Sequence, residues 1–149
     1  MARESDARSL ARSRRAARKL LVQALYQLQI AGQAWQDLYH QYQREPDAAG
    51  ADLEFFRELL LNIATGRAAL DETLARYSDI EPARLDPIEH GILWVGLYEL
   101  RHRPDVPFRV VISEAVELAK RFGATDGHKF VNGVLDRAAS ALRPNERSP

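Results

Sequence analysis

The amino-acid sequence predicts an all-α fold of about seven helices, arranged as two small bundles that share a core. Apolar residues recur at helical spacing along most of the chain, and no stretch alternates polar and apolar residues as a half-buried strand does. Helix caps and stops, mainly aspartate, proline and glycine, separate the apolar runs. At 149 residues, a single domain is the expected count.

The N-terminal half predicts four helices that follow a basic arm. Residues 1–12 show no apolar periodicity, and we expect them to form a disordered basic N-terminal arm. A helix is expected from residue 13 to about residue 31, with a core stripe of Ala17, Leu20, Leu21, Ala24, Leu28 and Ala31. A weaker helix at 34–43 precedes a linker that contains proline and glycine. Asp52 then caps a third helix, and Gly66 separates it from a short fourth helix.

The C-terminal half contains the clearest helix signals. Asp86 is placed as an N-cap, Pro87 stands at the first helical position, and Glu89 is placed to complete a capping box. Apolar residues then occur on every side of this helix up to about residue 102. Such a pattern predicts a central, buried helix.

Two further helices complete the predicted domain, which spans residues 13–143. The first ends at Gly123, a natural C-terminal stop. The second begins after a very short turn, with Thr125 or Asp126 as its cap. Residues 144–149 are expected to form a short C-terminal tail.

The formal net charge is zero, but the charges are unevenly distributed along the chain. Residues 1–19 hold seven of the 21 basic residues and two of the 21 acidic residues, so this segment carries +5 and the remainder −5. Basic arms often bind nucleic acid or an acidic partner, and others are only solvated tails. The absence of cysteine excludes disulfides and cysteine nucleophiles. No apolar run approaches the ~20 residues of a membrane span.

The sequence FGATDGHKFVNG is an unusual start for a helix. Phe130 lies about 100° from the core stripe of its helix, and Lys129 points almost opposite the core. The flank of Phe130 also carries Asp126, Gly133 and Arg137. Bases stack on such aromatic rings, and free N–H groups at a helix start attract phosphate. The alternative is that Phe130 packs beneath the first half of the chain.

The helix that starts at residue 13 has a second notable face, opposite its core stripe. This face carries Arg15, Lys19, Val22 and Tyr26, with Arg18 at its edge. An aromatic and an aliphatic side chain on a basic face suit an RNA or partner surface. The alternative is a second packing layer against another helix.

Four segments carry a family resemblance: RRAARKLLVQALYQLQ, LDPIEHGILWVGLYEL, DVPFRVVISEAVELAKRFGATDGHKFVNGVLDRAA and RPN. They resemble the NusB family of bacterial transcription antitermination factors, from about Arg14 to Asn145. The family's fold is all-α with two three-helix bundles, which agrees with the helices predicted above. The resemblance implies a cytoplasmic protein that pairs with the small-subunit ribosomal protein NusE and binds boxA, a short single-stranded RNA element. Such complexes act with RNA polymerase and other Nus factors in ribosomal RNA synthesis, and no membrane is involved.

The resemblance also implies roles for individual residues. The implied RNA-binding positions are Arg14, Arg15, Arg18, Asp126, Lys129 and Phe130. Tyr26 and Glu89 match positions that the family uses to bind NusE, and the capping box is a competing role for Glu89. The chain departs from the family pattern in its longer N-terminal arm and in Gly127, where a serine that could contact phosphate is common.

No catalytic or metal-binding pattern in the sequence is complete. Glu99 and His102 form an E-x-x-H pattern, but the second copy and the two further glutamates of a di-iron site are missing. No G-x-S-x-G, H-E-x-x-H or phosphate-loop motif occurs, so neither enzyme activity nor a cofactor is expected. Two other functions stay open: the NusB-like RNA-binding part of a ribosomal RNA cytosine methyltransferase, and a helical adaptor that binds only protein. RNA binding should weaken steeply with salt, whereas an apolar adaptor contact should not.

Overall fold

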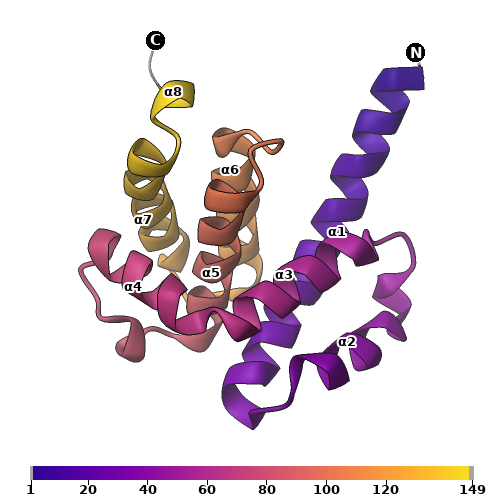
Figure 1. Ribbon diagram of the computed structural model, residues 1–149, viewed down its shortest axis with the longest axis horizontal. Helices are drawn as coiled ribbons and strands as arrows, with labels where there is room; N and C mark the ends of the chain where they lie inside the picture. The colour runs from indigo at the N-terminus through magenta and orange to yellow at the C-terminus, as the bar shows by residue number, and fades with distance from the viewer. Residues whose placement is uncertain (1, 148–149) are drawn as a thin grey trace. The chain divides into compact units, whose positions relative to one another are not determined.

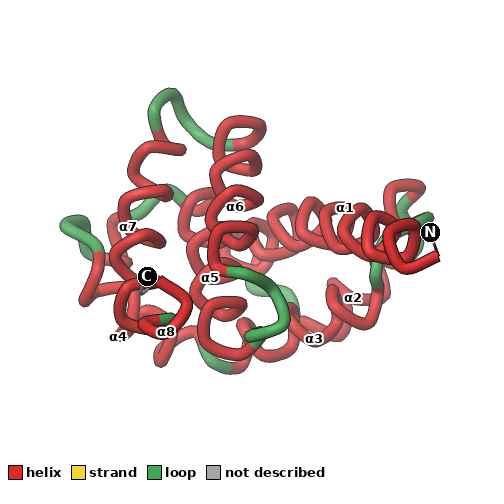
Figure 2. The backbone as a smooth tube through the Cα atoms, turned by 90° about the horizontal axis from the view of Figure 1, so that it is seen from above, coloured by secondary structure: helices red, strands yellow, loops and turns green. Residues whose placement is uncertain are grey.

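The computed structural model describes residues 2–147, which form helices joined by short loops (Figure 1). Eight α-helices and two short 3-10 helices occur in this range, and none of its residues lies in a strand (Figure 2). The all-α prediction is confirmed, and the eight α-helices roughly match the expected number of about seven. The chain forms two compact units, an N-terminal unit up to Thr65 and a C-terminal unit from Gly66, where the sequence predicts a break. No helix among the described residues is long and apolar enough to cross a membrane.

The N-terminal unit contains α1 (Ala2–Ala31), α2 (Trp35–Gln43), the 3-10 helix η1 (Pro46–Ala48) and α3 (Leu53–Thr65). Helices α2 and α3 pack against α1. Large, fully buried side chains from all three helices form the core: Leu20, Leu21, Leu25, Leu38, Phe55, Phe56, Leu59, Leu60 and Ile63. Asp52 caps α3 as predicted, because its carboxylate accepts a hydrogen bond from the backbone N–H of Phe55 at 3.0 Å.

The first turns of α1 differ from the disordered arm expected for residues 1–12. The structure continues α1 back to Ala2, and these turns extend beyond α2 and α3 (Figure 1). The side chains of residues 3–12 are all exposed. Alanine, arginine, glutamate and leucine favour a helix, and extending an existing helix avoids the cost of a new nucleus. Apolar periodicity is missing because this part of α1 has nothing to pack against; Met1 lies outside the described residues.

The C-terminal unit is built around one buried helix. It contains α4 (Arg67–Tyr77), the 3-10 helix η2 (Pro82–Arg84), α5 (Pro87–His102), α6 (Phe108–Phe122), α7 (Gly127–Leu142) and α8 (Pro144–Arg147). Every residue of α5 from 89 to 100 is buried, and α4, α6 and α7 all contact it. The prediction of a central helix is therefore confirmed. Gly96 allows close packing there, because a Cβ atom at this position would lie 2.8 Å from the methyl groups of Leu135.

The start of α5 follows the predicted cap in part. The carboxylate of Asp86 accepts hydrogen bonds from the backbone N–H groups of Ile88 and Glu89, at 2.9 and 3.3 Å, and Pro87 occupies the first turn. This satisfies two of the N–H groups that every helix start leaves without an intrahelical partner. The carboxylate of Glu89 lies in the turn before α7 instead of completing the capping box, and it is described with that turn below.

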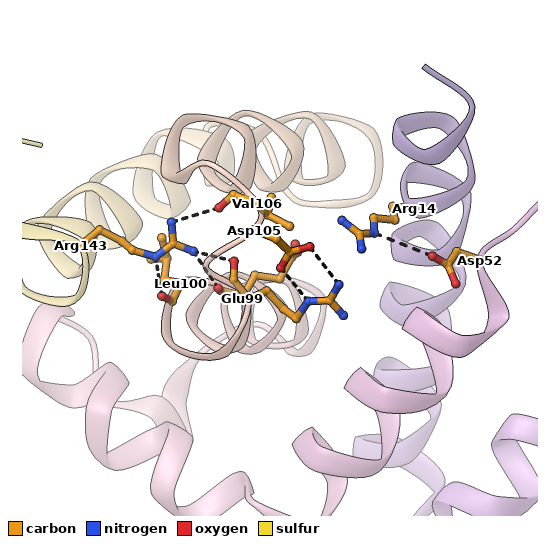
Figure 3. Close-up of polar contacts among 8 residues, drawn as sticks. Arg14, Asp52, Glu99, Leu100, Asp105, Val106 and Arg143 are labelled. Carbon is orange, nitrogen blue, oxygen red and sulfur yellow. Dashed lines mark hydrogen bonds and ion pairs between the residues drawn. The ribbon is translucent and has the colours of Figure 1, made fainter. Parts of the chain in front are cut away.

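The C-terminal end of α5 is held by a buried arginine. Figure 3 shows the guanidinium of Arg143, which is 8 % exposed, pointing at carbonyl groups from the end of α5 and the loop after it. It donates hydrogen bonds to the carbonyl oxygens of Leu100, Glu99, Arg103 and Val106, at 2.7, 3.0, 2.9 and 3.0 Å. Helix C-terminal carbonyls lack intrahelical partners and carry partial negative charge, so a cation stabilises them here.

Residues 144–147, expected as part of a tail, form the short helix α8. Its Glu146 accepts a hydrogen bond from the backbone N–H of Phe108 at 2.9 Å, at the first residue of α6, and another from Arg143 at 2.5 Å. These two donors hold the pKa of Glu146 below its usual value. The segment after α7 therefore connects the end of α5 to the start of α6. Residues 148–149 lie outside the described part of the chain.

The Glu146 carboxylate should make stability depend on pH. Because its pKa is lowered in the folded state, its contribution is complete above the unfolded value of about 4.5 and is lost as the pH falls through the folded value. Glu146→Gln should lower the free energy of unfolding at pH 7 by about 1 kcal/mol, since the side chain is partly exposed. The difference from the parent protein should shrink below pH 4.5 in urea unfolding. Glu117→Gln, at an exposed ion pair, is the control; an equal pH effect there would contradict the assignment.

Candidate nucleic-acid interface

Helix α1 has one face in the core of its unit and one face open to solvent. The predicted core stripe is buried except for Ala31, and Leu25 and Val22 are buried beside it. The position of Val22 resolves one open alternative, because it belongs to the second packing layer and not to a partner surface. Arg15, Gln23 and Tyr26 remain exposed, and Lys19 is half-buried.

Two of the three predicted RNA-binding arginines stack on one aromatic ring. The guanidinium carbons of Arg14 and Arg18 lie 5.3 and 5.2 Å from the ring centroid of Phe55, within the distance of a cation–π interaction. The Nε atom of Arg14 also lies 3.7 Å from the carboxylate of Asp52, and Figure 3 shows the two side chains facing each other. Arg18 is only 3 % exposed, so its side chain supports the surface instead of presenting a charge to solvent. The exposed cation of this group is Arg15.

The C-terminal half of the exposed α1 face is apolar. Tyr26 is 41 % exposed and Ile30, one turn further on, is 61 % exposed. Residues four apart lie on the same side of a helix, so the two side chains form one patch. The sequence analysis selected Tyr26 but not Ile30. The spacing of four residues between them could have indicated that Ile30 shares the exposed face.

The turn that starts α7 is shaped by Glu89. This residue is 8 % exposed, and its carboxylate accepts a hydrogen bond from the backbone N–H of Ala124 at 3.3 Å. A Cβ atom at Gly127 would lie 2.6 Å from a carboxylate oxygen of Glu89. A serine at position 127 would therefore require the Glu89 side chain to move. With glycine in place of serine, position 127 has no hydroxyl group, and the Glu89 carboxylate can approach the turn.

Asp126 and Lys129 form an exposed ion pair at the same turn. Asp126 has a left-handed backbone, with φ of 65°, and its side chain makes no hydrogen bond to the first turn of α7. It therefore occupies the N-cap position without the side-chain cap that the sequence predicts. Its carboxylate instead lies 3.3 Å from the Lys129 ammonium group. Both side chains are more than two-thirds exposed, so the pair is open to a ligand.

Phe130 is half-buried and does not belong to the core of its unit, in contrast to its neighbour Val131. Arg137, on the same flank as Phe130, is already engaged within the protein. Its guanidinium donates two hydrogen bonds to the carbonyl oxygen of Tyr77, at 2.9 and 2.7 Å. This leaves Lys129 as the exposed cation next to Phe130 in the sequence. The partial exposure of the ring is what a stacking residue needs.

The predicted site residues divide between the two units. Arg14, Arg15, Arg18 and Tyr26 lie on α1 of the N-terminal unit, whereas Asp126, Lys129, Phe130 and Glu89 lie around the start of α7 in the C-terminal unit. Arg14 and Arg18 share the ring of Phe55, and Asp126 pairs with Lys129. Tyr26 lies apart from the arginines, eight residues and about 12 Å beyond Arg18 along α1. Phe55 was missed at the sequence level, because its periodicity in α3 indicates only a core residue.

The histidine and acidic side chains of residues 2–147 form no metal-binding cluster. Among residues 2–147, no group of three or more histidine, aspartate or glutamate side chains is placed to hold a metal ion. Glu99 is buried and His102 is exposed, so the E-x-x-H pattern does not converge on a site. His90 makes a contact that holds two helices together. Its Nε2 atom lies 2.6 Å, and the Trp94 indole nitrogen 2.8 Å, from the same carboxylate oxygen of Asp71. This contact ties α4 to α5.

Residues 2–147 form a small all-helical protein with an exposed basic face on α1. A model of the NusB family matches residues 15–140, which is most of the chain. The chain therefore belongs to the NusB family, and the curated relatives described below are named transcription antitermination proteins.

Named relatives and solved structures agree with this assignment. The transcription antitermination protein NusB of Shewanella halifaxensis is 47 % identical over 130 residues, which cover 87 % of this chain and 96 % of the relative. That of Escherichia coli O139:H28 is 47 % identical over 135 residues, covering 91 % and 97 %. A structure of T. maritima NusB has a TM-score of 0.77 at 32 % identity and covers 89 % of this chain and 94 % of that one. A crystal structure of NusB and NusE with double-stranded RNA has a TM-score of 0.75 at 24 % identity, covering 87 % and 98 %, and shares the fold.

Because the guanidinium of Arg18 stacks on the ring of Phe55, we expect substitutions of these two residues to have coupled effects on the free energy of unfolding. Phe55→Leu keeps an apolar side chain and removes the aromatic face, and Arg18→Met keeps the length and removes the charge. Each should lower the free energy of unfolding, and the double variant should lose about 0.5–2 kcal/mol less than the sum. Urea unfolding of the four proteins measures this coupling. Strictly additive losses would show that Arg18 gains nothing from the ring.

Proposed function

We propose that this protein is a transcription antitermination factor that pairs with the ribosomal protein NusE and binds boxA single-stranded RNA. It acts in the cytoplasm with RNA polymerase and other Nus factors during ribosomal RNA transcription. The observation that carries the proposal is the exposed basic face of α1 in a chain of the NusB family. The fold shared with a NusB–NusE complex that contains RNA supports it.

RNA binding is assigned to two groups of side chains. On α1, Arg15 and the partly exposed Arg14 contact phosphates, while the buried Arg18 stacks beneath the surface on Phe55 and positions its neighbours. A guanidinium suits this task because its planar fork binds two phosphate oxygens at once.

At the start of α7, the ammonium of Lys129 contacts a phosphate and the ring of Phe130 stacks on a base. Asp126 directs Lys129 through their 3.3 Å ion pair and leaves it when phosphate binds. The mechanism is positioning and charge neutralisation, and no covalent step occurs. Affinity therefore depends on salt, because phosphate contacts release counterions.

NusE binding is assigned to the apolar half of the α1 face and to the turn held by Glu89. Tyr26 and Ile30 offer an exposed aromatic and aliphatic patch, which is typical of interface anchors. Glu89 is too buried to contribute a large contact area. Its part in the partner surface is to fix the shape of the 124–127 turn, with its remaining exposed edge available to NusE.

The two RNA groups should respond differently to substitution. Arg15→Ala should reduce the slope of log affinity against log salt by roughly 0.7, the value for one phosphate contact on single-stranded RNA. Phe130→Ala should cost ~1–3 kcal/mol of RNA affinity and leave the slope unchanged, because stacking involves no charge.

Fluorescence anisotropy of a labelled ribosomal RNA leader, with and without NusE and at several salt concentrations, measures both quantities. Arg67→Ala, an exposed arginine of α4, is the charge-matched control. Salt-independent binding by the parent protein would favour a protein adaptor over the proposed RNA factor. If Phe130→Ala instead lost the ~3–5 kcal/mol of folding stability expected for a core residue, its stacking role would be wrong.

Tyr26 should matter for NusE and not for folding. Tyr26→Asp places a charge in the exposed apolar patch, and truncation or disruption of such anchors commonly costs ~2 kcal/mol or more of binding. Calorimetric titration with NusE measures the loss. Leu10→Asp is a matched control, because Leu10 is similarly exposed and lies on the other side of α1. Unfolding of the Tyr26→Asp monomer, or unchanged NusE affinity, would show that Tyr26 is not an anchor.

A further inference from the structure

The exposed face of α1 continues toward its N-terminus as a row of cations. Arg8, Arg12, Arg15 and Lys19 follow one another at intervals of three or four residues. At 100° per residue these positions fall within about 60° of arc, so they form one stripe along the helix. The three arginines are exposed and Lys19 is half-buried. We call these four residues the basic stripe.

The basic stripe has few acidic neighbours on its own helix. No aspartate or glutamate occurs between Asp6 and Asp37. Glu4 lies on the same side one turn before Arg8, while Asp6 lies on the opposite side of the helix. Four like charges at this spacing repel one another and destabilise the helix. A polyanion that runs along the helix would relieve this repulsion.

Half of the basic stripe lies outside the part of the chain that the family model matches. The family model begins at residue 15, so it includes Arg15 and Lys19 but not Arg8 and Arg12. The additional turns are helical and continuous with the rest of α1. From Arg8 to Lys19 the stripe spans about 16 Å, at a rise of 1.5 Å per residue. Arg8 and Arg12 are therefore in line with the cations already assigned to RNA.

We propose that Arg8 and Arg12 bind phosphates of the same single-stranded RNA that contacts Arg15. This inference rests on the proposed function, and it extends the RNA contact of α1 by two helical turns beyond the family-matched residues. A row of regularly spaced cations on one helix face fits the regular charges of a nucleic-acid backbone. The apolar half of the same face, with Tyr26 and Ile30, is separate and remains for the protein partner.

The helical register is part of the proposal and makes it testable. Exchanging two neighbours, in the double variant Arg8→Ser/Ser9→Arg, keeps the composition and net charge but moves one cation by about 100° around α1. A flexible basic arm would bind RNA equally well after the exchange. A helical stripe would lose one of its phosphate contacts.

The experiment measures the affinity of the full chain for a labelled ribosomal RNA leader by anisotropy at several salt concentrations. Arg8→Ala/Arg12→Ala should flatten the slope of log affinity against log salt by about 1.4, two contacts at roughly 0.7 each. The Arg8→Ser/Ser9→Arg exchange should flatten it by roughly 0.7. Arg3→Ala is the control, since it removes one charge from the same turns but about 140° around the helix from Arg8, and it should leave the slope unchanged.

Each contrary result identifies what is wrong. If the parent protein binds RNA and Arg15→Ala flattens the slope while Arg8→Ala/Arg12→Ala does not, this inference is wrong and the proposed function stands. If the parent protein does not bind the RNA, the proposed function is wrong as well. If the double alanine variant keeps its RNA affinity but loses affinity for NusE, the stripe is a protein surface. If the exchange variant binds like the parent while the alanine variant does not, the arginines act as a flexible arm and the helical stripe is wrong.

Discussion

The stacking of two guanidinium groups on the ring of Phe55 determines which face of α1 is available for binding. Arg14 and Arg18 lie four residues apart, so both can reach one ring of α3. Their desolvation is offset by the negative face of the ring and, for Arg14, by Asp52. With these two cations turned toward the unit, helical geometry places Arg15 about 100° from Arg14 and about 60° from Arg18, where its side chain is exposed to solvent. The same geometry aligns Arg8, Arg12 and Lys19 with it.

A comparable constraint positions the second candidate surface. The carboxylate of Glu89, at the start of the buried helix α5, approaches the turn before α7 so closely that only glycine fits at position 127 without a shift. Its bond to the Ala124 N–H group fixes the turn from which Asp126 and Lys129 project. At the other end of α5, Arg143 satisfies four carbonyl groups. The candidate binding residues of this unit therefore depend on a helix that is itself buried.

The features that could be predicted from the sequence are those that depend on the residues of a single helix. The burial of α5 follows from apolar residues on all its sides, and the caps at Asp52 and Asp86 follow from local chemistry. The burial of Arg18 could not be predicted, because it depends on a ring from another helix. For the same reason the sequence left Val22 open between a partner surface and a second packing layer, and its burial favours the packing layer.

Two other differences have their own causes. Apolar periodicity indicates burial and not helicity, so it gave no sign that α1 begins at Ala2 and includes the exposed residues 3–12. Aspartate is a residue type that often caps helices, so the sequence predicts a cap at position 126. The backbone of Asp126 is left-handed, however, and its carboxylate pairs with Lys129 instead. The family resemblance located the candidate site residues, and the structure shows which of them present their side chains to solvent.

The most direct test of the binding face is amide NMR mapping of the labelled full chain during titration with a single-stranded ribosomal RNA leader. The structure predicts that the largest shift changes on α1 fall at Arg8, Arg12, Arg15 and Lys19, with smaller changes at Asp6 and Leu10 on the other side. A second group of changes should appear at 126–130. Changes spread evenly around the first turns of α1, or confined to α2 and α3, would contradict a helical RNA-binding face.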